Sequence, residues 1–414
     1  MVFGSKWPRL MALGLLSTGI FPEDTIAERL FHRPETSVIT PVCPTIGYPG
    51  VSNQTDLNAL AEFCTKIDGD LYINSNYTGP FVLNNVTNIT GSIRVTDWYR
   101  DDPLSLTSFE LPDLEHAGEI ALPAFSSLDR LSLPKLKHVS QIALAIPAEL
   151  DNLELPALTY LSTGRFHGDI SRISFPSLQT VNFRLSIDNA IALPQHQYQT
   201  HTTMNISLPA LETIPRLNIR GEVSALSVPN LTSMPFTGDP LDLKSELDFV
   251  TGRPISLAFP KLHHLDSDLV LSGNISSISL PSLRRIPSST WDTERHGANQ
   301  LTAGITIWSS GNLSLDLPIE SMGWMDIGMN VSSVALPNLQ NWSWISVDSV
   351  LPFNCSAFQG SFNETRERLE GDGYARNVTC SSLPESSASI AWSRGVVGVG
   401  SVVAGVVTLG VLLL

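Results

Sequence analysis

The chain has 414 residues, of which 42% are hydrophobic, and its formal net charge is −15 at pH 7. This length suffices for one large core or for two to three average domains, and the hydrophobic content excludes a disordered chain and a polytopic membrane protein. Because so acidic a surface repels phosphate backbones, we expect no nucleic-acid partner, whereas cations, basic proteins and neutral glycans stay open.

The N-terminal segment has the pattern of a secretory signal. Lys6 and Arg9 precede an apolar run, "LMALGLLSTGIF", from Leu10 to Phe21. A short positive stretch followed by an apolar stretch of this length is typical of a cleaved signal peptide. We therefore assign residues 1–25 to a signal peptide, with a short buried helix as the alternative.

Residues 43–66 predict an N-terminal cap with a short helix between Cys43 and the second cysteine. Four residues spaced i, i+3, i+4 and i+7 share one helix face: Leu57, Leu60, Ala61 and Cys64. Either Ser52 or Asn53 can serve as the N-cap of this helix, since both side chains carry an acceptor oxygen.

Residues 67–350 contain repeated copies of one short sequence motif. "ISLPALETI" begins at Ile206 and "ISLPSLRRI" begins at Ile278. Relative to the proline, apolar residues recur at offsets −12, −10, −6, −3, −1, +2 and +5. Gly164 is the one small residue that replaces an apolar one, and the pattern holds around Pro176, Pro229, Pro281 and Pro337.

This spacing predicts a solenoid of parallel β-coils. The pairs at −12/−10 and −3/−1 alternate with period two, so each forms a short strand with one buried face. Proline lacks an N–H for the ladder and ends the strand at a corner. A coil of about 20 residues buries its apolar face only by stacking on its neighbours. We predict an all-β solenoid of ten or eleven coils, a right-handed parallel β-helix related to leucine-rich repeats.

Three stretches depart from the regular coil. In the first coil Asn84 stands where the others have proline. The prolines Pro112, Pro123 and Pro134 are only 11 residues apart, which predicts either short turns or one split coil. Longer gaps follow Pro229 and Pro281 and predict protruding loops, the clearest from Ser288 to Gln300.

Trp324 and Trp344 are 20 residues apart, and each directly precedes the first buried residue of its coil. Both side chains should therefore point outward on adjacent coils. We interpret them first as a mutual packing pair shielded by the C-terminal cap. Because aromatic faces also pack against sugar rings, a glycan contact at these two residues is the alternative.

Residues 351–380 predict a second cap after the last coil, bracketed by Cys355 and Cys380. Four cysteines allow three pairings. The two ends of a linear stack cannot meet, so we expect local disulfides, Cys43 with Cys64 and Cys355 with Cys380. Metal binding is the rival interpretation, but the sequence has no CxxC motif and no nearby His cluster to support it.

The sequons support secretion. Thirteen Asn-X-Ser/Thr sites predict a glycosylated surface. They lie at Asn53, Asn76, Asn85, Asn88, Asn205, Asn230, Asn274, Asn312, Asn330, Asn341, Asn354, Asn363 and Asn377.

The C-terminal segment fits a glycosylphosphatidylinositol (GPI) attachment signal. Gly395 to Leu414 holds 20 uncharged residues, enough to cross a bilayer, with no Lys or Arg on the far side. Small residues in the short linker 381–394 precede this tail. We predict GPI attachment at Ser386 or Ser387 and removal of residues 395–414, with a retained transmembrane helix as the alternative.

These features together resemble a known family. The cap "LNALAEFCTKIDGDLYI", the "ISLPSL" coils, "FNCSAF" from Phe353 and the tail look like the fungal cell-wall organisation and sporulation-specific proteins with receptor L-domain-like repeats. The resemblance covers Cys43 to the C-terminus. It implies a GPI-anchored glycoprotein at the outer face of the plasma membrane or in the cell wall, needed for wall integrity, without enzymatic activity or cofactor.

The same resemblance implies the partners: the GPI lipid, and wall glycans or wall proteins. The family usually carries a long Ser/Thr-rich stalk before the anchor, whereas this chain has only Ser381 to Ser389. The short stalk therefore argues against covalent transfer to wall glucan and favours retention in the plasma membrane.

Two other classes of function remain open, a receptor-like binder of glycan or protein and an enzyme. The β-helices of pectin lyases and polygalacturonases act with clustered carboxylates. Here Asp101 and Asp102 form a pair, but His296 lies many coils away from them, beyond the ~5–10 Å that separates the two carboxylates of a glycosidase. The adjacent His263 and His264 fit a solvated turn. We therefore expect no enzyme.

Overall fold

The computed structural model describes residues 42–96, 104–122, 125, 128–189, 191–192, 198–199, 203–235, 246–266, 268–286, 303–363, 365, 367 and 376–382. All elements below belong to one compact unit, Thr40–Leu414. Several predicted features lie outside the described residues: the signal peptide, the loop Ser288 to Gln300, the tail, and Asp101, Asp102, His296, Ser386 and Ser387.

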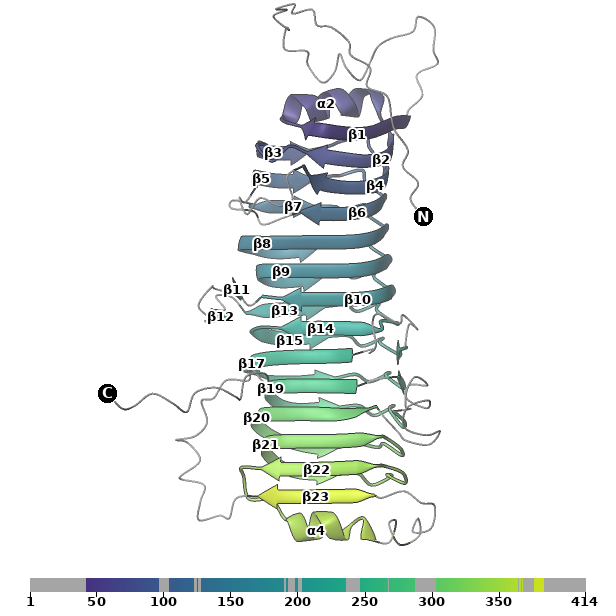
Figure 1. The fold of residues 1–414 in the computed structure, drawn as a ribbon, viewed down its shortest axis with the longest axis vertical. Helices are drawn as coiled ribbons and strands as arrows, with labels where there is room; N and C mark the ends of the chain where they lie inside the picture. The colour runs from purple at the N-terminus through teal and green to yellow at the C-terminus, as the bar shows by residue number, and fades with distance from the viewer. Residues whose placement is uncertain are drawn as a thin grey trace, which may run out of the picture. The chain divides into compact units, whose positions relative to one another are not determined.

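The main sheet joins fourteen strands in chain order, each parallel to the next (Figure 1). The strands are β1 (Val42–Val51), β2 (Lys66–Ile73), β4 (Asn88–Val95), β6 (His116–Leu122), β8 (His138–Glu154), β9 (Tyr160–Ser174), β10 (Thr180–Asp188), β14 (Arg216–Arg220), β17 (Glu246–Ala258), β19 (Asp268–Ser279), β20 (Gly304–Asp316), β21 (Trp324–Ala335), β22 (Trp344–Ser349) and β23 (Asn377–Ser382). The prediction of stacked parallel coils is confirmed.

A second row of strands forms the other side of each coil. In β8, β9, β17, β19, β20 and β21 the strand bends and supplies both sides itself, as the shifted register between β8 and β9 shows. Elsewhere separate strands do so: β3 (Thr78–Val82), β5 (Ser105–Glu110), β7 (Arg130–Ser132), β13 (Met204–Ser207) and β15 (Val223–Ser227). Short pairs lie beside the coils: β11 (Ile191–Ala192) with β12 (Tyr198–Gln199), and β16 (Ser233–Met234) with β18 (His264–Leu265).

The described chain contains eleven coils that close at a corner residue, as predicted. Their main strands are β2, β4, β6, β8, β9, β10, β14, β17, β19, β20 and β21. The tight proline spacing is one coil: Pro112 follows β5 and Pro134 follows β7, while Pro123 falls between β6 and β7. The split coil is therefore the correct interpretation there. Strand β22 begins a twelfth coil, which the C-terminal cap replaces.

The core consists of the apolar residues at the seven offsets. Around the four prolines all of these positions are buried except Leu226, Val334 and Leu336, which are half-buried. For the last two the reason is topological. Strand β22 pairs only with Trp324–Met329, so the second half of β21 is an edge without a further coil on it. Leu226 is half-buried for the same reason, because among the described strands its own strand β15 pairs only with β13 and has an unpaired edge on its other side.

Each end of the stack is closed by a helix and a disulfide. Helix α2 (Gln54–Phe63) has Asn53 as its N-cap, whose side chain accepts from the N–H groups of Thr55 and Asp56. The Cys43–Cys64 disulfide joins β1 to the end of this helix. In the described chain no helix is both long and apolar enough to cross a bilayer.

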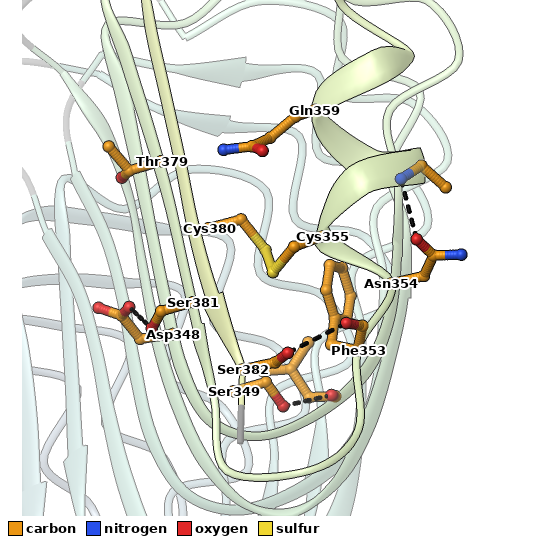
Figure 2. The surroundings of a disulfide bond; sticks show 12 residues. Asp348, Ser349, Phe353, Asn354, Cys355, Gln359, Thr379, Cys380, Ser381 and Ser382 are labelled. Carbon is orange, nitrogen blue, oxygen red and sulfur yellow. Dashed lines mark hydrogen bonds between the residues drawn. A yellow bond between two sulfur atoms is a disulfide. The ribbon is translucent and has the colours of Figure 1, made fainter. Parts of the chain in front are cut away.

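At the other end helix α4 (Cys355–Gly360) is joined to β23 by the Cys355–Cys380 disulfide. Figure 2 shows Cys380 pointing from the strand toward the first turn of this helix. The core of this cap is a chain of touching rings: Trp342, Phe362, Phe358 and Phe353. Both predicted pairings are thus confirmed.

Candidate functional site

Trp324 and Trp344 lie in register on β21 and β22 and point outward, because the next residue of each strand, Met325 and Ile345, is fully buried. Trp344 keeps 36% of its surface exposed. The expected shielding of this pair by the C-terminal cap is therefore wrong at Trp344. The cap helix α4 packs against β23 at the end of the stack (Figure 1) and leaves this ring partly exposed.

A third tryptophan, Trp308 on β20, is 41% exposed on the same face and lies in register with Gly328. We call Trp308, Trp324 and Trp344 the aromatic face. The offset pattern missed Trp308 because it places this residue, ten before Pro318, among the buried ones. The corner between the buried Ile307 and Leu313 is longer than in other coils and shifts the pattern. Only the local alternation of Ile305 and Ile307 points to an outward Trp308.

Two glycines let these rings lie against the sheet. A Cβ on Gly328 would lie 3.2, 3.3 and 3.4 Å from Cε3, Cζ3 and Cδ2 of Trp308. Such similar distances to three neighbouring ring atoms place Gly328 under the face of the ring rather than at its edge. Likewise, a Cβ on Gly304 would collide with Cγ and Cδ2 of Trp324. Each ring therefore rests on a glycine of the neighbouring strand.

Asp326 lies between the two ring seats. It stands two residues from Trp324 and two from Gly328 on β21, so the seats are about 13 Å apart at 3.3 Å per residue. Burial, and then the nearby charge of Asp348, raise the pKa of Asp326 above its usual value. Asp348 accepts a hydrogen bond from Ser381, which Figure 2 shows, whereas Asp326 has no hydrogen-bond partner among the described residues.

This arrangement has the chemistry of a carbohydrate contact. Aromatic faces that lie flat on a sheet offer apolar area to the C–H faces of sugars. A carboxyl without a protein partner can accept a hydrogen bond from a sugar hydroxyl, or donate one when it is protonated. The separation of the two ring seats along the strand direction suits an extended polymer rather than a single sugar.

The structure also has a groove at the C-terminal end, between the exposed second half of β21 and helix α4. Its volume is about 580 Å³, and its walls include Val334, Leu336, Phe353 and Phe358. The lining residues are apolar, hydroxyl or amide side chains, with no ionisable group among them. The groove therefore offers packing surface but no acid or base.

All thirteen sequon asparagines lie in the described part of the chain, and none of them is buried. Some have structural roles: Asn53 and Asn354 cap helices α2 and α4. Others donate from the side-chain amide to a backbone carbonyl: Asn85 to Ala61 in helix α2, and Asn230 and Asn330 to Pro209 and Ser310 of the preceding coil. The sequons thus lie where a glycan has access, in the coils and in both caps.

The remaining candidates are not brought together. His263 and His264 are both exposed near β18, and His264 lies 3.0 Å from Asp266. Both described disulfides occupy all four cysteines. In the described ranges no three His, Cys, Asp or Glu side chains are grouped as metal ligands.

The geometry of the aromatic face is therefore the basis for the functional interpretation. Comparisons with protein-family models, with curated proteins and with solved structures found no match to this chain.

Proposed function

We propose that this chain is a non-enzymatic, GPI-anchored surface glycoprotein that contributes to the organisation and integrity of a fungal cell wall. In this proposal the stack is right-handed and receptor L-domain-like, and Trp308 and Trp324 of the aromatic face bind wall polysaccharide. The observation that carries it is the pair of rings, Trp308 and Trp324, each seated on a glycine, on either side of Asp326.

Two further features support an extracellular role. Disulfides form and persist in oxidising compartments, and here one closes each end of the coil stack. None of the sequon asparagines is buried, and nine of the thirteen are exposed, as the attachment of glycans requires. The acidic chain favours neutral polymers such as glucan and chitin over anionic ones.

Retention on insoluble wall polymers tests the proposal. The full-length protein, solubilised from membranes in detergent, is mixed with glucan or chitin particles and the bound fraction is measured. We expect the wild type to be retained and Trp308→Ala/Trp324→Ala to lose at least tenfold in affinity, since each aromatic contact contributes about 1 kcal/mol or more.

Phe183→Ala is the matched control, because Phe183 is a similarly exposed aromatic residue on β10, distant from the aromatic face. Its retention should equal that of the wild type. Binding of polymer would be excluded if the wild type washed off every particle, or if the double variant bound as well as Phe183→Ala. Deleting the gene should, in addition, sensitise cells to wall stress.

Polysaccharide cleavage is the second candidate function, and one observation favours it. A carboxyl with a raised pKa, such as Asp326 between two aromatic rings, is a common feature of sites that transfer protons. The release of reducing sugar in the same mixtures decides between the two. Release that Asp326→Asn abolishes would replace the binding proposal with hydrolysis.

A further inference from the structure

Asn377 continues the row of tryptophans onto the last strand of the sheet. Trp324 pairs in register with Trp344, and Trp344 pairs in register with Asn377 on β23. Neighbouring strands lie about 4.8 Å apart, and residues in register project from the same face of the sheet. The side chains of Asn377 and Trp344 therefore project from neighbouring positions on the same face of the sheet.

The Asn377 side chain is well placed for modification. It begins the sequon Asn377–Val378–Thr379 and is exposed. Its amide makes no hydrogen bond with the described residues, although its backbone N–H donates to the carbonyl of Ser343. In the described chain β23 ends the strand order, so no further strand stands on its outer side.

The neighbouring Trp344 has a flank with little cover. The ring of Trp324 rests on Gly304 of β20, which draws it away from Trp344. On the opposite side the residue in register with Trp344 is Asn377, whose side chain is short, and 36% of the surface of Trp344 stays exposed. An exposed indole beside an unmodified asparagine leaves apolar area that a sugar ring would cover.

We propose that the first N-acetylglucosamine of a glycan on Asn377 packs against the indole of Trp344. The proposal rests on the proposed function in one respect, because the chain must pass through the secretory pathway. There the Asn377 amide nitrogen bonds to C1 of an oligosaccharide carried on a lipid pyrophosphate. The nitrogen loses one proton and the lipid pyrophosphate leaves.

The strand spacing suits this contact. A sugar on Asn377 rises from the sheet alongside Trp344 at about 4.8 Å, within the 4.5–7 Å range of stacked ring centroids. The C–H face of the pyranose then meets the ring face. This contact needs only the first sugar, so it survives trimming of the glycan to one residue.

Asn205 is a matched comparison within the same chain. It is also an exposed sequon asparagine on a strand, but its partners in register are Arg172 and Ala225. A glycan on Asn205 has no aromatic neighbour in register and should add little to stability.

The inference divides the aromatic face into two parts. Trp308 and Trp324 stay available to wall polysaccharide, whereas Trp344 is covered by the glycan of the chain itself. Replacing Trp344 should therefore leave retention on polymers within about twofold of wild type, unlike replacing Trp308 and Trp324. This difference separates a failure of the inference from a failure of the proposed function.

The test uses the full-length protein from a yeast host, with site occupancy measured by mass spectrometry. We expect Asn377 to be occupied, and Asn377→Gln to lower the thermal midpoint by about 2–4 °C, the usual effect of one lost ring contact. It should also raise the quenching of tryptophan fluorescence by acrylamide. Trimming with an endoglycosidase that leaves one sugar should change neither quantity.

Two sets of variants complete the experiment. In a Trp344→Ala background, Asn377→Gln should have no further effect, because the partner of the sugar is gone. Asn205→Gln should not alter the wild-type midpoint. The inference is overturned if Asn377 is bare while other sequons are occupied, or if the effects of Asn377→Gln and Trp344→Ala add. If no sequon is occupied, the proposed function fails as well.

Discussion

Gly304 shows how one hydrogen atom in place of a side chain organises the aromatic face. It lies buried on β20, and its N–H donates to the buried carboxylate of Asp268. The ring and the backbone carbonyl of Trp324 occupy the space that a Cβ on Gly304 would need. A residue that carries no functional group thus sets the orientation of one that does.

Replacing Gly304 by Ala should therefore disturb both stability and the ring. Because a backbone carbonyl as well as a ring stands in the way, we expect a loss of about 1–3 kcal/mol in the free energy of unfolding. Chemical denaturation measures this loss, and the emission maximum of tryptophan reports the displaced ring. Gly328→Ala is the control, since only the ring of Trp308 must shift there, at 3.2 Å. Equal effects of both variants would contradict this account.

Asp326 makes the stability of the protein depend on pH. Its raised pKa means that the folded chain holds this proton more tightly than the unfolded chain does. The free energy of unfolding therefore increases, through this group, as the pH falls from above the raised pKa toward the usual pKa of an aspartate. Above that window the ionised carboxylate, beside Asp348, costs stability.

Asp326→Asn should consequently be more stable than wild type at pH 7, by about 1 kcal/mol or less because solvent screens a partly exposed group. The gain should vanish near pH 3–4, where the wild-type carboxyl is protonated. Urea unfolding at several pH values gives the comparison, with the exposed Asp316→Asn as control. A variant that is less stable than wild type at pH 7 would show that ionised Asp326 has a favourable partner.

At the scale of the element, the caps decide where unfolding begins. Solenoid coils contact only their neighbours, so the end coils are held from one side by the stack and from the other by the cap. At the N-terminal end the Cys43–Cys64 disulfide joins α2 to β1, the packed face of α2 contacts β1 and β3, and β1 pairs with β2. The first coil buries Leu71 and Ile73 completely only because this cap is in place.

Cys64→Ser should therefore loosen the first coils before the rest of the stack. The chain-entropy model gives about 3 kcal/mol for a loop of this length. Hydrogen exchange should show faster exchange in β2, around Leu71 and Ile73, with β19 to β21 unchanged. Cys380→Ser is the mirror control, and its effect should concentrate in β22. Uniform exchange along the chain after either change would mean that the stack unfolds as one unit.

The elements also show what a sequence can and cannot predict. The alternation around each proline predicted the buried residues, the corners and the number of coils, because every regular coil solves the same packing problem. The pattern failed where the packing of a coil differs from that of the regular coils. Val334 and Leu336 follow the pattern but stay half-buried, since no further coil covers them. Trp308 breaks the pattern because its corner is longer.

The candidate site was harder to predict than the fold for the same reason. Trp324 and Trp344 stood out because both precede a buried residue at equal spacing. The seats that Gly304 and Gly328 provide depend on which strands are in register, and the loop lengths between coils hide that register in the sequence. Outward positions carry no periodic constraint, so only the structure brings a glycine, a carboxyl and a tryptophan together.

At the scale of the whole molecule, the proposed anchor would decide how the stack is oriented toward the proposed cell wall. The aromatic face lies on β20 to β22, near the C-terminal end of the described strands. Ser382, the last described residue, donates to the carbonyl of Phe353 in the C-terminal cap. An anchor attached shortly after it would keep the aromatic face close to the membrane, at the inner layer of a wall.

This anchoring is the last prediction. If residues 395–414 form a GPI signal, phosphatidylinositol-specific phospholipase C should release the protein from membranes, provided that the inositol is not acylated. Two Lys residues at the centre of the tail, at Val403 and Ala404, should prevent recognition of the apolar run and send the protein into the medium, because each charge costs about 2.5–3.5 kcal/mol there. Replacing Ser386, Ser387 and Ala388 together by bulky residues should block attachment. Protein that the lipase never releases, and that keeps a tag placed after Leu414, would replace the lipid anchor with a transmembrane helix.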